Sequence, residues 1–420
     1  MALDTIQQPE LAQIERIGGA DLVIGMVDPE HTNNVGAAVG MVRDALGRLS
    51  NSLRTVVVCP NGSVDAASAG PQSIDDVSSP AVVWVNLPQT GSSGATLLNL
   101  SEAYQAVLTI GGRLGARACG IISSEPHAMT SESVYLLVHP LFEMGFDLVM
   151  PRYTRQKMEG LLNRSILSPL SRALYGERLQ NPMGPDFAMS GKLLQRILAQ
   201  SDGKRAGSAV HPVACIASTA ACCGFQVCES YLGVRVQPAT NWADLSTLLA
   251  LVLEPVFTDI ERNAVFWQRI RGSKHVPWFG TPEPDSGEAG TVDFQRMVET
   301  FQLGTQNLQE VWGPVLPPTT LLELRRLARL PAAQFRMPDD LWASIVYDFV
   351  LGYRLRTISR DHLLRSITPL YLGWIASYAN ELESAGPALV ESRLERLSVA
   401  FESRKPYLLS RWRWPDRFNP

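Results

Sequence analysis

The sequence predicts an α/β fold with a mostly parallel sheet and flanking helices, followed by an all-helical C-terminal region. Two observations predict it. Up to about residue 240, short apolar runs alternate with segments of helical period, and after Asn241 the strand signals stop. Strands that alternate with helices form βαβ units, in which right-handed crossovers join parallel strands. Hydrophobic residues at 45% and charged residues at 19% are typical of a globular chain.

The expected strands are short runs in which odd and even positions are both largely apolar. A strand that is buried on both faces of a parallel sheet has this pattern, whereas a half-buried strand alternates between apolar and polar residues. Each run is about four to eight residues long, the usual length of such a strand. The runs are residues 21–27, 54–59, 81–86, 116–122 and 146–150.

Segments of helical period separate these runs and then fill the C-terminal part of the chain. Thr130 is expected to cap the helix over 131–144, because its hydroxyl can accept from the free N–H groups of the first turn. Residues 272–290, rich in proline and glycine, are expected to form a loop. The helices are expected over 33–49, 101–114, 131–144, 245–270, 292–304, 319–329, 341–356, 361–382 and 389–402.

Length and patterning together indicate two domains. A chain of 420 residues is expected to form about two or three domains, because single cores rarely exceed about 250 residues. The alternating signals give way to purely helical signals near residue 240. We therefore predict one domain over residues 1–240 and a helical domain over residues 241–420.

The charge balance argues against nucleic acid as a partner. Lys and Arg number 37 against 41 Asp and Glu, which leaves a formal net charge of −4 and no general attraction to a phosphate backbone. Residues 1–19 lack a basic segment followed by an apolar run, so they do not read as a signal peptide. No segment approaches the ~18 uninterrupted apolar residues of a membrane span. We expect a cytoplasmic protein with no membrane span.

The cysteines and histidines do not form a recognised metal motif. The six cysteines are sparse for this length, so reduced thiols are expected. Cys222, Cys223 and Cys228 cluster without a nearby histidine, which favours buried structural thiols over metal ligands. The sequence also contains no P-loop, G-x-S-x-G or H-E-x-x-H pattern.

Polar residues that directly follow the expected strands are the candidates for a site, because ligands of open α/β sheets bind beyond the carboxyl ends of the strands. These segments are residues 28–31, 61–65, 123–125 and 152–157. Glu125 is suited to hold a divalent cation, or its segment is only a polar turn. The cationic residues of 152–157 are suited to bind an anion, or they form a solvated face.

Two other residues have two interpretations each. Asp186 ends the tight turn 181–186. It is either part of a functional site or the N-cap of a helix that starts near Phe187. Trp278 is a candidate for stacking on the ring of a ligand, with ordinary packing of an exposed turn as the alternative.

Several stretches resemble one family of enzymes. They are Pro151–Arg155, Asn163–Gly176 and Asn181–Ser190, and the match extends in order to Trp342–Asp348 and Asp361–Gly373. Over essentially its whole length, the chain resembles bacterial GT-A-fold glycosyltransferases of the mannosylglycerate or glucosylglycerate synthase type. The resemblance implies a GT-A, Rossmann-like sheet in the first half and the helical region of the same group in the second.

The resemblance also implies a reaction. It is the retaining transfer of a hexose from a nucleotide sugar to a small polar acceptor such as glycerate. A divalent metal, Mg or Mn, would neutralise the charge of the departing nucleotide diphosphate as a Lewis acid. The implied partners are the nucleotide sugar and the acceptor. As a protein partner we expect a further copy of the chain or, if the chain is an inactive relative, an active paralogue.

Carried over residue by residue, the resemblance assigns candidate roles. The catalytic candidates are Asp186 and Arg155, and the acceptor side falls on Tyr153, Lys157 and Asn163. The donor side falls on Asn61, Ser124 and Glu125, and the metal ligands on Glu125 and Gln237. Asp28 and Asp65 join the donor candidates because they follow the first two expected strands.

The metal and nucleotide motifs depart from the family's pattern. The family's Asp-x-Asp motif falls on Ser123-Ser124-Glu125, which keeps one carboxylate, and its later metal-binding histidine falls on Gln237. An amide is a poor replacement for an imidazole on a catalytic cation. The alternative prediction is therefore a catalytically inactive relative that acts as a binding or regulatory subunit.

Overall fold

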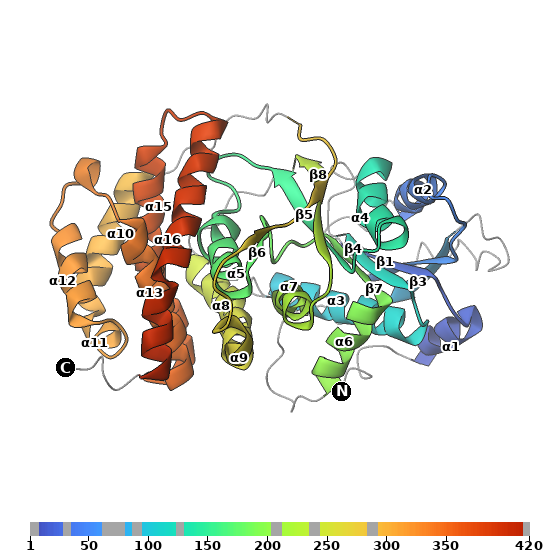
Figure 1. Ribbon diagram of the computed structural model, residues 1–420, viewed down its shortest axis with the longest axis horizontal. Helices are drawn as coiled ribbons and strands as arrows, with labels where there is room; N and C mark the ends of the chain where they lie inside the picture. The colour runs from blue at the N-terminus through green and yellow to red at the C-terminus, as the bar shows by residue number, and fades with distance from the viewer. Residues whose placement is uncertain are drawn as a thin grey trace. The chain divides into compact units, whose positions relative to one another are not determined.

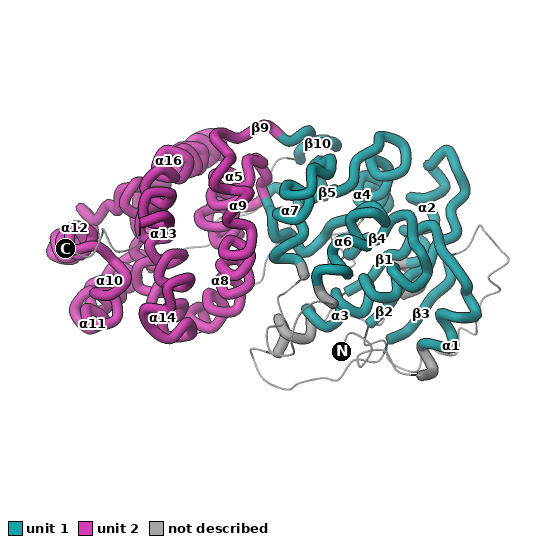
Figure 2. Tube along the Cα trace, turned by 60° about the horizontal axis from the view of Figure 1, so that its bottom comes forward, with its two compact units in different colours: residues 1–154, 181–235, 276–284 teal, residues 155–180, 236–275, 285–420 magenta. Residues whose placement is uncertain are grey.

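The computed structural model describes residues 8–27, 35–60, 80–85, 95–122, 130–202, 212–234, 244–283 and 293–414. The chain divides into two compact units, which Figure 2 shows in different colours. The sheet unit comprises residues 1–154, 181–235 and 276–284, and the helical unit comprises residues 155–180, 236–275 and 285–420. The units are thus interleaved along the sequence. The domain boundary expected after residue 240 stays a prediction.

The sheet unit is built on a sheet that is mostly parallel, as the sequence predicts, and that has eight strands among the described residues (Figure 1). Its strands are β1 (Leu22–Met26), β2 (Thr55–Pro60), β3 (Ala81–Val85), β4 (Ala118–Ile122), β5 (Leu148–Thr154), β7 (Phe187–Ser190), β8 (Val227–Val234) and β10 (Trp278–Phe279). Their order across the sheet is β10-β8-β5-β7-β4-β1-β2-β3. The described pairings are parallel except those of β7, which runs antiparallel to both β4 and β5. The strands expected from the sequence correspond to β1 to β5.

Helices cover both faces of this sheet, which is why its strands are apolar on both parities. The helices of the sheet unit are α1 (Gln8–Ile17), α2 (Val35–Leu46), α3 (Ala95–Arg113), α4 (Ser131–Glu143), α6 (Gly191–Asp202) and α7 (Pro212–Cys223). Figure 1 shows α2 and α4 on one side of the strands and α3 and α6 on the other. Thr130 caps α4 as predicted, because its hydroxyl accepts from the Ser133 N–H at 3.2 Å.

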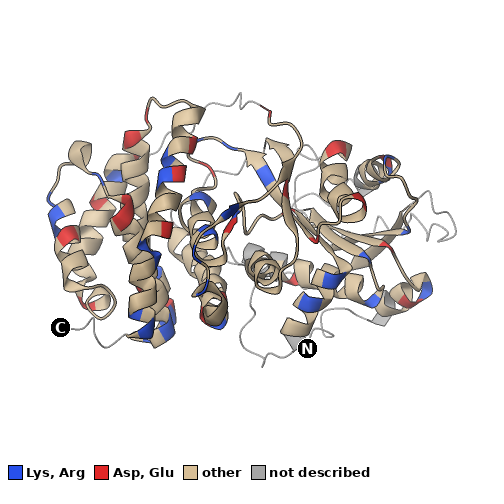
Figure 3. Cartoon of the chain, in the orientation of Figure 1, with Lys and Arg blue, Asp and Glu red and all other residues tan. Residues whose placement is uncertain are grey.

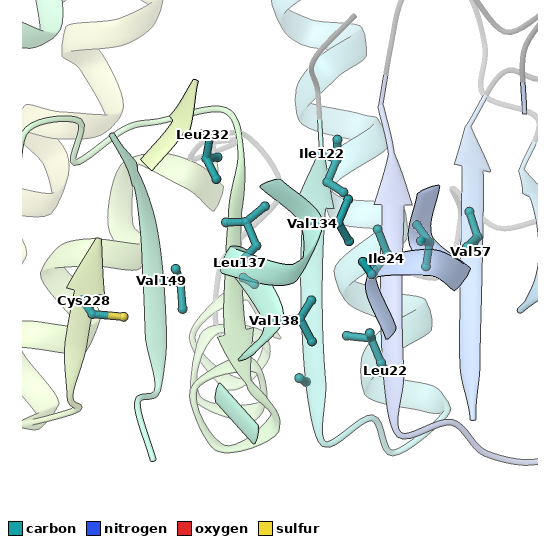
Figure 4. Packing of buried hydrophobic residues seen from close by; sticks show 14 of the residues in the cluster. Leu22, Ile24, Val57, Ile122, Val134, Leu137, Val138, Val149, Cys228 and Leu232 are labelled. Atoms are coloured by element: carbon teal, nitrogen blue, oxygen red, sulfur yellow. The ribbon is translucent and has the colours of Figure 1, made fainter. Parts of the chain in front are cut away.

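Alternate strand residues pack against the two helix layers. Ile24 of β1 and Val149 of β5 lie in one core with Val134 of α4 (Figure 4). On the opposite face, Gly25 lies directly against Val107 of α3, and a Cβ at Gly25 would come within 2.4 Å of a Val107 methyl carbon. The absence of a side chain at this position lets α3 approach the sheet closely.

The helical unit consists of helices and one short strand pair, β6 (Glu177–Arg178) with β9 (Lys274–His275), within the ranges that the structure describes. Nowhere in these ranges is a helix long and apolar enough to cross a bilayer. The helices are the π-helical turn η3 (Asn163–Leu167), α5 (Ser168–Tyr175), α8 (Leu245–Arg262), α9 (Ala264–Trp267), α10 (Phe294–Asn307), α11 (Gln309–Trp312), α12 (Pro318–Leu327), the 3₁₀ turn η4 (Ala332–Gln334), α13 (Asp339–Leu355), α14 (Arg360–Ser366), α15 (Thr368–Glu381) and α16 (Pro387–Arg413).

Some local predictions were wrong. The helix expected over 361–382 is broken into α14 and α15, because Pro369 lacks an N–H group and is accommodated in the first turn of α15. The loop expected over 272–290 contains β9 and β10, whose pairing partners lie far away in the sequence. A helix does not start near Phe187: this residue opens β7, and α6 begins at Gly191.

Buried guanidinium groups join α16 to other parts of the helical unit, whose helices carry both signs of charge (Figure 3). Arg172 of α5 contacts Glu395 at 2.6 Å and Glu402 at 2.9 Å, both on α16. Arg393 of α16 contacts Asp339 of α13 at 2.7 Å. Both arginines are almost wholly buried, so a guanidinium that lost its carboxylate partners would be a buried, uncompensated charge. These pairs therefore specify how α16 lies against α5 and α13.

Asp348 of α13 is a fully buried carboxylate that faces α16. Its Oδ1 accepts hydrogen bonds from the Tyr407 hydroxyl at 2.7 Å and from Arg411. Its Oδ2 has no hydrogen-bond partner among the residues described. Burial raises the pKa of Asp348 from its ordinary 3.8 to about 7, although Arg411 and Tyr407 oppose the shift.

We predict that Asp348 makes the stability of the chain depend on pH near neutrality. The folded chain binds this proton more tightly than the unfolded chain, so the stabilisation is complete below pH 3.8 and is lost as the pH rises through about 7. In Asp348→Asn, which does not titrate, the free energy of unfolding should therefore fall less between about pH 5 and pH 8. Urea unfolding at a series of pH values measures this difference.

The control is Asp361→Asn, which changes an exposed aspartate paired with Arg365 on the surface. This variant should keep the wild-type dependence on pH. The prediction is contradicted by an Asp348→Asn variant whose stability falls with pH as steeply as that of the wild type.

Candidate functional site

The candidate site lies at the carboxyl edge of the sheet, where β7 enters between β4 and β5. β4 ends at Ile122 and β5 ends at Thr154. The antiparallel pairing of Phe187 with Ile121 brings Asp186, the residue before β7, to the level of Ile122. Ligands of open α/β sheets bind at this edge. The antiparallel strand therefore carries Asp186 to the place where a ligand is expected.

A buried hydrogen bond holds the Asp186 side chain. Asp186 is 0% exposed, and its Oδ2 accepts from the hydroxyl of Tyr153 in β5. Tyr153 lies in the same core as Val149 of β5 and Ala188 of β7. Since side chains alternate between the faces of a strand, Tyr153 and Asp186 meet on the face that α4 covers. The structure thus brings together two of the residues predicted for the site.

The turn that precedes this carboxylate is held from two sides. The Asn181 side-chain amide donates to the Pro151 carbonyl at 3.0 Å. Gly184 lies so close to β5 that a Cβ there would come within 2.1 Å of Pro151 Cγ. From α3, the Tyr104 hydroxyl donates to the Pro185 carbonyl at 3.0 Å. The backbone that carries the carboxylate is therefore fixed to both β5 and α3.

On the opposite face of β5, Arg152 pairs with Glu229 of β8. Arg152 Nη1 lies 2.9 Å from Glu229 Oε2, and the Glu229 side chain is 0% exposed whereas that of Arg152 is 30% exposed. The anion that Arg152 meets therefore belongs to the chain itself. Glu229 was not among the residues predicted for the site, although it is an acidic residue within the otherwise mostly apolar run 227–234.

Three more of the predicted residues, Arg155, Lys157 and Asn163, belong to the helical unit. Lys157 Nζ donates to the carbonyls of Leu382 at 3.0 Å and Glu383 at 2.5 Å, just after α15 ends. A lysine in this place satisfies the free carbonyls of the helix and interacts favourably with its dipole. Its predicted role in binding the acceptor stays a prediction.

Arg155 and Asn163 lie on either side of a tight turn. Gly160 has a φ of +60°, and a Cβ there would come within 2.6 Å of Arg155 Nη1, so the arginine folds over this glycine. Asn163 opens the π-helical turn η3, and its Oδ1 is buried without a hydrogen-bond partner among the described residues. Turns of this type occur frequently at functional sites.

The predicted donor and metal residues lie outside the described residues. They are Asp28, Asn61, Asp65, Ser124, Glu125 and Gln237. Among the residues that are described, no group of three or more His, Cys, Asp or Glu side chains comes together as metal ligands would.

The thiols differ among themselves in burial. Burial raises the pKa of the Cys59 thiol to about 12 and that of Cys119 to about 12, which keeps both protonated. Cys228 is also buried, whereas Cys223 is exposed, so the expectation of burial was wrong for Cys223. Protonated, buried thiols are poor nucleophiles and poor metal ligands.

Comparison with known proteins finds no family model and no curated protein that matches the chain. One similar solved structure is glucosyl-3-phosphoglycerate synthase from Mycobacterium tuberculosis, in complex with Mn²⁺, uridine-diphosphate-glucose and phosphoglyceric acid. It is 16% identical to this chain, with a TM-score of 0.35, and the match covers 60% of this chain and 83% of that chain. Mannosyl-3-phosphoglycerate synthase from Rubrobacter xylanophilus is 13% identical, with a TM-score of 0.38, over 62% of this chain and 80% of that chain. These low values assign no activity, ligand or residue role to this chain.

We predict that Tyr153→Phe destabilises the chain, because it leaves the buried Asp186 carboxyl without its hydroxyl donor. The free energy of unfolding should fall by about 1 to 3 kcal/mol, as measured by urea denaturation. Tyr104→Phe is the matched control, since it removes a hydroxyl that donates to a neutral carbonyl, and it should cost less. Equal losses in the two variants would show that the hydrogen bond to Asp186 stabilises the chain no more than the hydrogen bond to the Pro185 carbonyl does.

We predict that Lys157→Met also lowers the free energy of unfolding, by about 1 to 3 kcal/mol, because it removes two hydrogen bonds at the end of α15. Urea denaturation measures the loss. Lys192→Met, which changes an exposed lysine of α6, should be nearly neutral. If both variants are equally stable, Lys157 does not serve as a helix cap in solution.

Proposed function

We propose that this chain is a glycosyltransferase-like protein that transfers a hexose from a nucleotide sugar to a small polar acceptor such as glycerate. Two of the stretches that resemble the family, 151–155 and 181–190, contribute β5 and β7, which are adjacent in the sheet. The observation that carries the proposal is the buried pair of Asp186 and Tyr153 at the carboxyl edge of the sheet.

A fixed carboxylate suits the chemistry of hexose transfer. When the nucleotide diphosphate departs, positive charge develops at the anomeric carbon, as in the oxocarbenium-like transition states of glycoside cleavage. A negative group that is already oriented and shielded from water stabilises this charge without reorganising. Tyr153 occupies one acceptor position of Asp186 and so holds the carboxylate in one orientation. Because Asp186 is fully buried, its charge in this proposal acts on the reacting sugar through space, without direct contact.

Arg155 is proposed to bind the phosphate of the leaving group. A guanidinium keeps its charge at all relevant pH values and can bind phosphate oxygens in a bidentate manner. Its fold over Gly160 restricts its orientation before any ligand arrives. The buried Oδ1 of Asn163 is an acceptor suited to a hydroxyl group, which supports the predicted place of Asn163 on the acceptor side.

A divalent cation, Mg²⁺ or Mn²⁺, is part of the proposal through the resemblance alone. Its predicted ligands, Glu125 and Gln237, lie outside the described residues, and the described residues do not supply a set of ligands in their place. When bound, such a cation would supply Lewis-acid stabilisation of the leaving group. The steps assigned to Asp186, Arg155 and Asn163 do not depend on it.

We predict that Asp186→Asn lowers hexose transfer at least about 100-fold, because it removes the negative charge while keeping the shape of the side chain. The substrates to test are uridine-diphosphate-glucose and guanosine-diphosphate-mannose, each with glycerate and phosphoglycerate, with product detected by mass spectrometry. Calorimetry should show that the donor still binds, which separates chemistry from binding.

Asp44→Asn, on an exposed aspartate of α2, is the control in the same unit and should transfer at the wild-type rate. Circular dichroism of both variants checks that they fold. If the wild-type chain binds no donor and forms no product with any pair of substrates, the proposal fails. The alternative hypothesis, a catalytically inactive relative, then stands.

A further inference from the structure

One face of the sheet unit carries a polar and aromatic group that the proposed function does not use. On β8, Cys228 and Leu232 lie in the core beneath α4. Glu229 directly follows Cys228, so its side chain faces the opposite side of the sheet. β10 pairs Trp278 with Glu229, and Trp278 therefore faces the same side as Glu229. Arg152 of β5 also points to this side, where it meets Glu229. Three strands thus place Glu229, Arg152 and Trp278 together.

The contacts among these side chains form a stack. The Arg152 guanidinium lies 2.9 Å from the buried Glu229 carboxylate and its Cζ lies 5.2 Å from the centre of the Trp278 ring. Such a distance is that of a cation–π contact. Glu229 therefore fixes the arginine, and the arginine in turn fixes the indole.

The backbone on which Trp278 stands is also held in place. The Pro277 carbonyl accepts from the Glu229 N–H at 2.9 Å, and Phe279 packs edge-on against Phe146 with ring centres 5.7 Å apart. After the strand, the Tyr231 hydroxyl accepts from the Glu283 N–H at 2.9 Å. The indole is therefore presented by a rigid segment at the edge of the sheet.

Despite these constraints, Trp278 remains 44% exposed. A rigid, half-exposed indole is a surface on which the apolar C–H face of a sugar ring can pack, with little entropy lost on binding. Because Glu229 compensates the charge of Arg152, the group as a whole offers little attraction to a free anion. It favours a neutral ring with hydroxyl groups, to which the remaining N–H donors of Arg152 can bond.

We propose that Trp278, oriented by the Arg152–Glu229 pair, is a binding site for the pyranose ring of a neutral hexose. The choice of a hexose over other rings rests on the proposed function. The site lies at the end of the sheet formed by β5, β8 and β10, and Trp278 is its contact residue. Arg152 and Glu229 are positioning residues.

The test is fluorine NMR of the full chain labelled with 5-fluorotryptophan. The chain has nine tryptophans, and the spectrum of Trp278→Phe assigns the Trp278 resonance. Glucose, mannose, uridine-diphosphate-glucose and uridine diphosphate alone are titrated separately. We expect the Trp278 resonance to shift saturably with the hexoses and with the nucleotide sugar, and to stay in place with uridine diphosphate.

Trp278→Ala should weaken hexose binding about tenfold, the equivalent of 1.4 kcal/mol, as measured by saturation-transfer NMR of the sugar. Trp414→Ala, on another exposed tryptophan, is the matched control and should bind as the wild type does. A Trp278 resonance that moves with uridine diphosphate alone overturns the proposal in favour of a nucleobase site. A resonance that no sugar moves overturns it as well.

These outcomes are separable from the failure of the proposed function. If calorimetry shows donor binding and product forms while the Trp278 resonance stays in place, the ring site is wrong and the transferase stands. If the resonance moves with free hexose but no donor binds and no product forms, the ring site stands and the transferase is wrong.

Discussion

The antiparallel strand β7 is the constraint on which the sheet unit depends. It hydrogen-bonds β4 on one side and β5 on the other, and so joins the strands β10-β8-β5 to the strands β4-β1-β2-β3. An antiparallel strand begins where its parallel neighbours end. The residue before β7 therefore stands at the carboxyl edge, and that residue is Asp186. A parallel strand in this position would begin at the opposite edge of the sheet.

The end of β5 serves both faces of the sheet at once. Arg152 and Tyr153 are consecutive, so their side chains point to opposite faces. On one face Tyr153 orients the Asp186 carboxyl, and on the other Arg152 joins Glu229 and Trp278. Buried polar groups on a sheet are tolerated only when they are paired, and each of these pairs spans two strands. The polar groups thus depend on the strand order as much as on their own chemistry.

The helical unit uses buried charge for another purpose. Its arginines join helices that are distant in sequence, as Arg172 joins α5 to α16. Because a buried charge without a partner is costly, an arrangement of the helices that separated these pairs would be disfavoured. Asp348 is the exception within this pattern, since burial leaves its carboxyl partly protonated near neutrality.

The apolar runs by themselves determined β1 to β5, because a strand covered on both faces needs apolar residues at successive positions. Local capping likewise determined the start of α4 at Thr130. Only the tertiary structure decided β7 and β10, since such short strands are stabilised by partners far away in the chain. The same holds for Tyr153 with Asp186, 33 positions apart, and Arg152 with Glu229, 77 positions apart. Such pairs form through strand order, and the local pattern of residues contains no information about which strands will be neighbours.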